Sequence, residues 1–172
     1  MTGHPYKRHA RVARRTLLVV GEGYAEVAFL KHIRDLYTCG GAGCSMAIAN
    51  ARGKGAQHVV AYAVRTARAT AHDQVAALLD SDTDWNEKVE GVARIKKISV
   101  LLCQPCLEGP LLHIHGVALD RSTAEHKKDF RDRFGGDAHD AGLLEKCFPK
   151  ELLDDARARV PLLTGLLSLL GV

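Results

Sequence analysis

The chain has 172 residues, of which 47% are hydrophobic and 26% are charged, a balance that excludes wholesale disorder and fits one globular domain. Its apolar runs are far shorter than the roughly 20 residues that cross a membrane, and no apolar signal-peptide core follows the N-terminus, so we expect a cytoplasmic protein without membrane contact. The formal net charge of +4 is too small to be a nucleic-acid signature by itself.

Positive charge is concentrated in residues 1–15, which form a basic N-terminal arm without acidic residues. Such an arm can neutralise the phosphates of a nucleic acid, or it can stay solvated and only keep the protein soluble. The arginines that we consider for nucleic-acid binding here are Arg11, Arg14 and Arg15.

Strands and helices alternate along residues 16–117, the predicted core. Short apolar, β-branched runs predict buried strands, and apolar residues at i, i+3, i+4 and i+7 predict amphipathic helices. The alternation predicts an α/β fold, with a mainly parallel sheet of about four strands flanked by helices. The predicted strands are 16–20, 45–49, 74–79 and 98–103, and the predicted helices are 24–37, 58–69 and 86–96.

The composition changes after Gly116, and residues 118–172 are predicted to be a C-terminal extension of about two or three helices packed on the core. The last segment, PLLTGLLSLLGV, places its leucines on one helical face. We expect this face to pack against the sheet, and the alternative is an interface with a second copy or another partner. The leucines are Leu162, Leu163, Leu166, Leu167 and Leu170.

The cysteines raise the question of a zinc site. Cys103 and Cys106 have zinc-ligand spacing in CQPC, and Cys39 and Cys44 could complete a set. Structural zinc sites usually have two tight pairs, however, and the second pair is spread over a Gly-rich loop. We therefore favour free thiols.

Acidic residues follow three of the four predicted strands. Glu22 follows the first strand, Asp80 and Asp82 follow the third, and Glu108 follows the fourth. Glu26 joins them because its spacing places it on the inward face of the next helix. Functional residues gather at the carboxyl ends of parallel strands, so we expect these side chains to converge.

Converging carboxylates indicate a bound cation, since they otherwise repel and raise one another's pKa. Oxygen ligands without soft partners suit Mg²⁺ or Mn²⁺, and this many acids would suit one or two ions, as in phosphodiester hydrolysis. Asp80 and Asp82 are two apart and would point to the same side of an extended chain. Each acid by itself could instead cap a helix or sit in a turn.

The glycine-rich turn GEG does not match a phosphate-binding loop. A dinucleotide fingerprint needs glycine where Glu26 stands, and Gly53-Lys54-Gly55 does not complete a P-loop. The loop after the second predicted strand carries Arg52 and Lys54, which are candidates to bind flanking phosphates of a nucleic acid.

Three segments resemble the TOPRIM domain of topoisomerases, bacterial primases and overcoming-lysogenization-defect (OLD) nucleases, and most closely its RloB-like branch. VVGEGYAEVAFLKHI resembles the opening EG-x-[ST]-E-x-x-[YF] pattern, and LLDSDTD resembles the D-x-D motif. QPCLEGPLLHIHG resembles the N-P-C-[FL]-E-x-W-L-L-L-H-[FY] block. Together these segments cover residues 17–116, and the last block favours a family motif over a zinc pair at CQPC.

The resemblance implies a Rossmann-like TOPRIM fold and a Mg²⁺-dependent nuclease, associated with defence against phage and often found beside an ATPase partner. The TOPRIM metal ligands correspond to Glu22, Asp80 and Asp82. Glu26 matches the second glutamate of the nuclease type, and Glu108 matches the late acid of the family.

The chain also departs from the family pattern. Ala25 stands where Thr or Ser is common, Gln104 replaces Asn or Ser, and Gly109-Pro110 replaces a bulky pair. The acids themselves are all present, so these departures bear on activity more than on the fold.

The leading hypothesis is metal-assisted hydrolysis of a nucleic-acid phosphodiester in DNA or RNA, including tRNA. Glu26 or Glu108 would be a second-metal ligand or a general base. His113 is a candidate proton shuttle, or alternatively a helix histidine next to the site or in the core. The alternative function is a non-catalytic TOPRIM subunit that docks a partner, such as an ATPase, through the leucine-rich tail.

Overall fold

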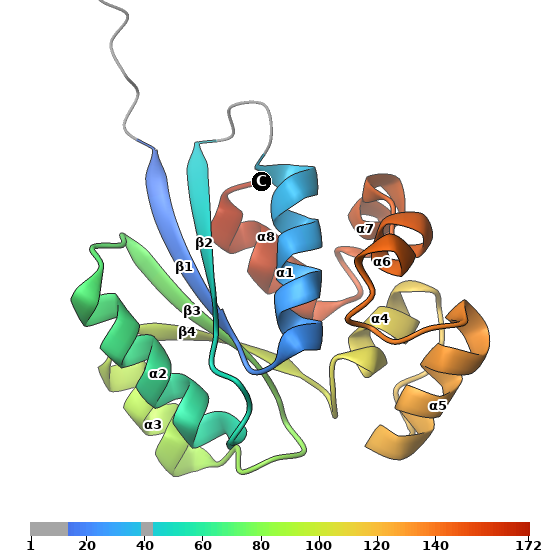
Figure 1. The fold of residues 1–172 in the computed structure, drawn as a ribbon, viewed down its shortest axis with the longest axis horizontal. Helices are drawn as coiled ribbons and strands as arrows, with labels where there is room; N and C mark the ends of the chain where they lie inside the picture. The colour runs from blue at the N-terminus through green and yellow to red at the C-terminus, as the bar shows by residue number, and fades with distance from the viewer. Residues whose placement is uncertain (1–13, 39–42) are drawn as a thin grey trace, which may run out of the picture.

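A computed structural model describes residues 14–38 and 43–172. Its centre is a four-stranded sheet in the order β2-β1-β3-β4, and every strand pair is parallel (Figure 1). The predicted α/β fold is thereby confirmed, and each predicted strand is found within one residue at either end. The strands are β1 (Arg15–Gly21), β2 (Cys44–Asn50), β3 (Gln74–Asp80) and β4 (Ile98–Cys103).

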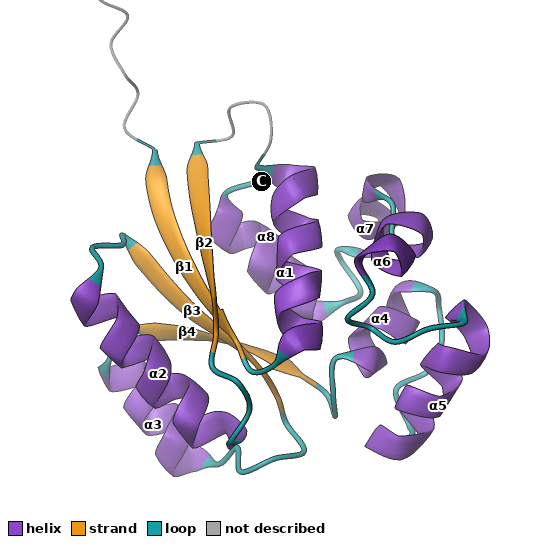
Figure 2. Cartoon of the chain, viewed as in Figure 1, coloured by secondary structure: helices purple, strands orange, loops and turns teal. Residues whose placement is uncertain are grey.

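Alternate residues of the central strands face two separate hydrophobic clusters. In β1, Leu17 and Val19 belong to one cluster, whereas Leu18 and Val20 belong to the other, as the two-residue period of a strand requires. Figure 2 shows α2 and α3 on one face of the sheet and α1 and α8 on the other. Four helices follow the strands: α1 (Tyr24–Tyr37), α2 (Gly55–Ala69), α3 (Glu87–Ile95) and α4 (Glu108–Ile114).

The strand order creates a topological switch point between β1 and β3. The chain leaves β1 toward β2 on one side and then crosses over to β3 on the other side of β1. The carboxyl ends of β1 and β3 are therefore neighbours, although 58 residues separate Glu22 from Asp80. Open α/β sheets bind their ligands at such a point.

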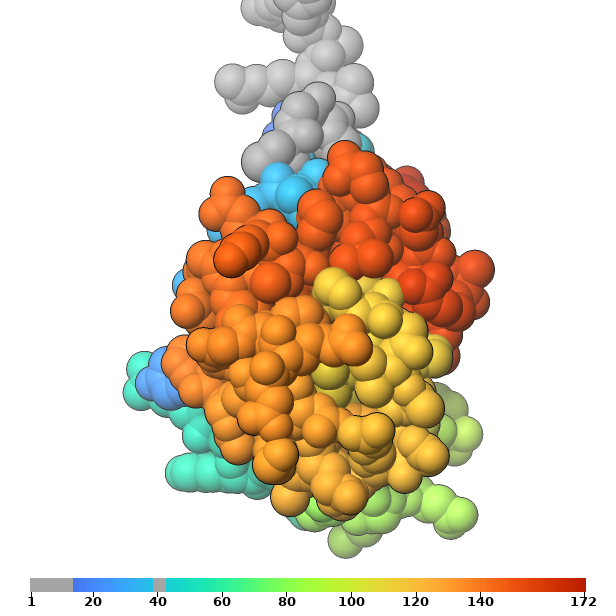
Figure 3. Space-filling view, turned by 90° about the vertical axis from the view of Figure 1, so that its right-hand side faces the viewer, coloured from blue at the N-terminus to red at the C-terminus, as the bar shows by residue number. Residues whose placement is uncertain are grey.

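The C-terminal extension contains four helices, more than the sequence analysis predicted, because glycine and proline divide it into short pieces. Gly135 ends α5 in a left-handed conformation, and Pro149 and Pro161 stand at the starts of α7 and α8. α5 packs on α4, and in the space-filling view of Figure 3 it lies on the surface beside the segment that follows α4. The four are α5 (Thr123–Phe134), α6 (Ala141–Cys147), α7 (Lys150–Ala156) and α8 (Pro161–Leu170).

The leucine face of α8 is covered within the chain. Its five leucines are between 0% and 3% exposed and belong to the same hydrophobic cluster as β1 and α1. They therefore pack inward, as the first interpretation of the sequence expects, and in this structure they do not form an exposed interface for a partner. None of the described helices is long and apolar enough to cross a membrane.

Helix α2 begins three residues earlier than its periodicity predicts, because a distant side chain caps its first turn. The carboxylate of Asp84 accepts hydrogen bonds from the backbone N–H groups of Ala56 and Gln57. These donors have no partner within the helix, so the cap extends α2 to Gly55. Asp84 follows Asp80 and Asp82 in the sequence, but its carboxylate serves this cap.

Candidate functional site

The candidate site is a carboxylate cluster at the switch point between β1 and β3. The backbone N–H of Asp80 donates to Oε2 of Glu22 over 3.2 Å, and the N–H of Glu22 donates to the carbonyl of Leu78 over 3.0 Å. The turn after β1 is thus fixed directly onto the end of β3. The structure brings together Glu22, Glu26, Asp80, Asp82 and Glu108, all of which the sequence analysis singled out.

Asp80 is the most perturbed member of the cluster. Burial, followed by the charges of Glu26 and Glu22, raises its pKa to about 8, and Asp82 and Glu108 add to the effect. Its Oδ1 atom is buried and finds no hydrogen-bond partner among the described residues. A buried carboxylate oxygen without a donor is costly, and a cation or a bound proton would satisfy it.

Glu26 is held at the start of α1. Its side chain is only 6% exposed, as its spacing from the apolar face predicts, and Oε2 accepts the N–H of Gly23 over 2.8 Å. Burial raises its pKa, and Glu22 and Glu108 raise it further, against the lowering effect of the backbone hydrogen bonds. Glu26 therefore caps its helix and also contributes charge to the cluster.

Asp82 does not lie where an extended chain would place it. Strand β3 ends at Asp80, and the N–H groups of Ser81 and Asp82 both turn toward the carbonyl of Pro105, at 3.1 and 3.2 Å. The alternation of a strand therefore stops before Asp82, which is exposed and accepts a hydrogen bond from the hydroxyl of Thr123. The prediction that both aspartates point the same way rested on an extended backbone, which the turn removes.

The QPC segment supports the cluster through its backbone. Pro105 provides the carbonyl that holds the Ser81–Asp82 turn, and Glu108 begins α4 shortly afterwards. The Cys106 thiol is hydrogen-bonded to Glu108, and burial together with this carboxylate raises the thiol pKa to about 12. Cys106 is therefore a neutral, buried partner of Glu108 and not a thiolate ligand.

A zinc site that combines these cysteines is contradicted by the sheet. Cys103 ends β4 and Cys106 follows it, whereas Cys44 begins β2 at the opposite edge of the same parallel sheet. Cys39 lies outside the described residues. A strand of seven residues spans about 20 Å at a rise of about 3.3 Å per residue, far beyond the reach of one ion.

Gly109 is required by a close backbone approach. A Cβ atom at this position would lie 2.5 Å from the carbonyl oxygen of Gln104. We expect Gly109→Ala to lower the free energy of unfolding by about 2 kcal/mol or more, because the backbone before Glu108 must move. Urea unfolding measures the change.

Gly91→Ala is the matched control, since its Cβ would meet no heavy atom of the described chain within 4 Å apart from its chain neighbours and the backbone of its own helix. Alanine in this helix should stabilise the protein by about 0.5–1 kcal/mol. Equal effects of the two substitutions would contradict the steric account of Gly109.

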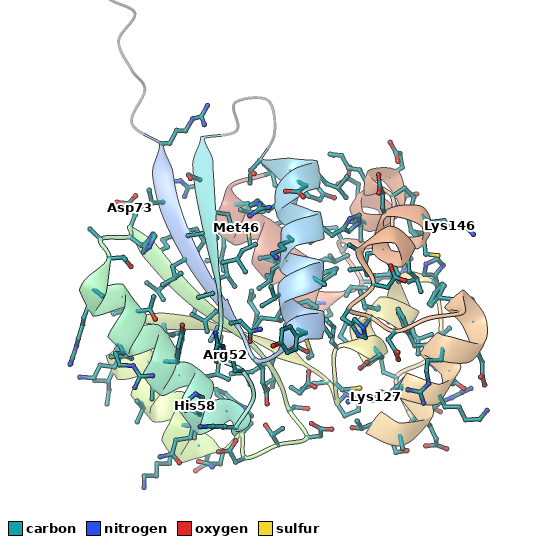
Figure 4. The ribbon with its side chains drawn as sticks, in the orientation of Figure 1. Met46, Arg52, His58, Asp73, Lys127 and Lys146 are labelled. Carbon is teal, nitrogen blue, oxygen red and sulfur yellow. The ribbon has the colours of Figure 1, made fainter. Side chains whose placement is uncertain are left out.

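Helix α5 contributes two residues that the sequence analysis missed. Thr123 bonds Asp82, and Lys127, one turn later on the same face, approaches the cluster from the side of α5 (Figure 4). Partial burial lowers the pKa of Lys127, but Glu108, Cys106 and the two aspartates outweigh this and raise it. No local motif marks these residues, because α5 reaches the site only through its packing on α4.

The predicted cationic residues are separated by the structure. Arg52 and Lys54 lie beside the cluster, because the N–H of Gly53 donates to the carbonyl of Glu22 over 2.7 Å. Arg14 and Arg15 are exposed at the amino end of β1, about 20 Å from the acidic edge at about 3.3 Å per residue. That distance places them beyond phosphates that flank the cluster, and Arg11 lies outside the described residues.

His113 is turned away from the acids. Its Nδ1 atom is hydrogen-bonded to the carbonyl of Val117 at 2.9 Å. The ring lines a largely apolar cavity between β4, α4 and α8, to which none of the five carboxylates contributes. His113 is only partly buried, and this position does not support a proton shuttle.

The donor set fits a hard divalent cation. Every nearby acid offers carboxylate oxygen, and Asp80 presents a buried oxygen that lacks a partner among the described residues. Within residues 14–38 and 43–172, no three histidine, cysteine, aspartate or glutamate side chains are already gathered as ligands of one ion. Glu22 instead accepts a hydrogen bond from the backbone N–H of Asp80, and Asp82 accepts one from the hydroxyl of Thr123. Both side chains would have to rotate to bind a cation.

Fold and site together define an α/β protein with an all-parallel sheet and a carboxylate cluster at its switch point. Comparisons with protein-family models, with curated proteins and with solved structures found no match.

Proposed function

We propose that the chain is a metal-dependent nuclease that hydrolyses nucleic-acid phosphodiesters at the carboxylate cluster. The observation that carries the proposal is Asp80, whose buried Oδ1 has no partner among the described residues while four further carboxylates surround it. Such an arrangement is unfavourable for the folded chain alone and favourable with a cation. The resemblance of the three acidic segments to TOPRIM nucleases supports the same proposal, including a role in defence against phage.

In this proposal Glu22, Asp80 and Asp82 hold Mg²⁺ or Mn²⁺, as one or two ions. When bound, the cation supplies Lewis acidity, which activates water and stabilises charge on the scissile phosphate. We assign the role of general base to Glu26, whose pKa is raised by burial and by the nearby charges of Glu22 and Glu108. Lys127 adds a positive charge on the side of α5, where the phosphate becomes more negative during the reaction.

The test is cleavage of labelled RNA, including tRNA, and of labelled DNA by the purified full chain. We expect cleavage with Mg²⁺ or Mn²⁺ and none with EDTA. The absence of divalent-dependent cleavage on every substrate, together with unchanged thermal stability in Mn²⁺, would contradict the proposal. Metal binding without cleavage would instead favour the non-catalytic subunit.

Lys127→Gln separates a role in cleavage from a general effect of charge. We expect a loss of cleavage of about a hundredfold, since one positioned charge is removed from the site. Lys128→Gln is the control, because Lys128 pairs with Asp132 on the exposed side of the same helix. Equal rates for the two variants would remove Lys127 from the mechanism.

A further inference from the structure

A basic groove lies next to the carboxylate cluster, between the end of β2 and helix α2. It has a volume of about 510 Å³, which is within the usual range for a small-molecule site of about 300–1,000 Å³. Its charged lining residues are Arg52, Lys54 and Arg65, and His58 and Tyr62 add two rings. Of the described residues that line it, none is acidic, although five carboxylates stand nearby.

The cations of the groove are available to a ligand. In the described chain none of Arg52, Lys54 and Arg65 takes part in a salt bridge. The guanidinium of Arg65 instead lies over the Tyr62 ring, 5.5 Å from its centroid. An arginine stacked on an aromatic ring offers a flat surface to a nucleobase as well as charge to a phosphate.

The loop that carries Arg52 and Lys54 is held in an unusual conformation. Residues 52–55 all have positive φ angles, of 62°, 78°, 75° and 81°, and two of them are not glycine. Left-handed backbone is unfavourable for residues with a Cβ atom and is maintained where surrounding structure imposes it. Figure 4 shows Arg52 and His58 on this side of the strand ends.

Backbone hydrogen bonds fix this loop to the turn after β1. The N–H of Ala51 donates to the carbonyl of Gly21 over 2.9 Å, and the Ala51 carbonyl is 3.1 Å from Nε2 of His58. Together with the bond between Gly53 and Glu22, these contacts fix the position of the groove relative to the acids. A ligand held in the groove would therefore lie next to the carboxylate cluster.

We propose that this groove binds an unpaired nucleotide of single-stranded nucleic acid next to the scissile phosphodiester. The statement that the bound nucleic acid is then cleaved rests on the proposed function. Arg52, Lys54 and Arg65 contact its phosphates, and its base stacks on the Tyr62–Arg65 pair. A concave site of this size holds a splayed nucleotide, whereas a paired base is stacked inside its duplex and cannot enter.

The experiment is fluorescence anisotropy of the full chain with short oligo(dT), oligo(U) and a blunt-ended duplex, in EDTA at several salt concentrations. We expect both single strands to bind more tightly than the duplex. Arg65→Ala should lower the slope of log K against log salt by about 0.7, the value for one phosphate contact on a single strand. Arg68→Ala, at an exposed position of α2 outside the groove, should leave the slope unchanged.

Two further variants separate charge, stacking and folding. Lys54→Gly should lower the slope in the same way without lowering the melting temperature, because glycine adopts the positive φ freely. Tyr62→Leu should weaken binding by about fivefold or more with an unchanged slope. A preference for oligo(U) or oligo(dT) would identify RNA or DNA as the ligand.

Equal affinity for the blunt-ended duplex and the single strands, or equal slopes for Arg65→Ala and Arg68→Ala, would overturn the proposal that the groove binds an unpaired nucleotide. Because binding is measured without metal, its outcome is independent of cleavage. If single strands bind as expected but are not cleaved in Mg²⁺, the proposed nuclease activity is contradicted and the proposal for the groove is supported. Cleavage that is unaffected by Arg65→Ala and Tyr62→Leu would contradict the role of the groove and leave the proposed nuclease activity in place.

Discussion

Asp80→Asn is expected to abolish divalent-dependent cleavage, with a loss of at least about a hundredfold, and to stabilise the metal-free protein at high pH. The first effect follows because the substitution removes a charged ligand from the centre of the cluster. The second follows because Asp80 is half-buried beside four other carboxylates, which an uncharged side chain does not repel.

The pH dependence of the second effect has a definite sign. Folding raises the pKa of Asp80 from 3.8 to about 8, so the folded chain binds this proton more tightly than the unfolded chain. The metal-free protein should therefore lose stability as pH rises from about 4 to about 8, and lose no more from this group above that. The Asp80→Asn variant has no such loss, and its advantage at pH 9 should be on the order of 2–5 kcal/mol.

Urea unfolding in EDTA at pH 5 and pH 9 measures this difference, and a gel assay with Mg²⁺ measures cleavage. Asp155→Asn is the control, because Asp155 is exposed on α7, far from the strand ends. It should change neither quantity. If Asp80→Asn cleaves normally, Asp80 is not a metal ligand. If Asp80→Asn is less stable than the unsubstituted protein at pH 9, the account of charge repulsion at Asp80 is contradicted.

Addition of Mn²⁺ or Mg²⁺ to the metal-free protein is expected to raise its melting temperature, and to do so more at pH 8 than at pH 6. Binding to the folded state alone contributes about 2.7 kcal/mol at a hundredfold excess over Kd, or roughly 5–10 °C for a chain of this length. The pH effect follows because the cation must displace the proton that Asp80 holds below about pH 8.

Differential scanning fluorimetry at constant ionic strength measures this shift. Asp80→Asn and Glu22→Gln should lose most of it, whereas Asp155→Asn should keep it. A shift that survives in both cluster variants would place the cation elsewhere on the chain. A shift that is larger at pH 6 would contradict competition with the proton on Asp80.

Much of the fold could be predicted because its signals are local. The buried runs of β1 and β3 are too apolar for anything but strands covered on both faces, and Glu26 is placed by helical spacing alone. The positions of Glu22 and Asp80 follow directly from the ends of those strands. The division of the C-terminal extension was underestimated because the effect of each Pro and Gly there depends on what its neighbours pack against.

The site was less predictable where it depends on long-range contacts. Asp84 follows the same strand as Asp80 but caps α2, which only the packing of that helix decides. Asp82 does not continue the alternation of β3, because the carbonyl of Pro105 accepts hydrogen bonds from the turn that follows the strand. Lys127 lies near the acids but belongs to α5, where no sequence motif marks it. The partners in these contacts are many residues apart, so no spacing rule connects them.

The sequence by itself determined the class of the fold and the convergence of acids at one edge, because periodicity and strand ends are properties of neighbouring residues. Only the tertiary structure decided which strands are neighbours, and so that Glu22 and Asp80 share a switch point. It also decided that the extension brings Thr123 and Lys127 to the acids, and that a groove without acidic lining residues in the described chain lies beside them. The physical reason is that burial of both sheet faces, not local propensity, fixes how distant segments meet.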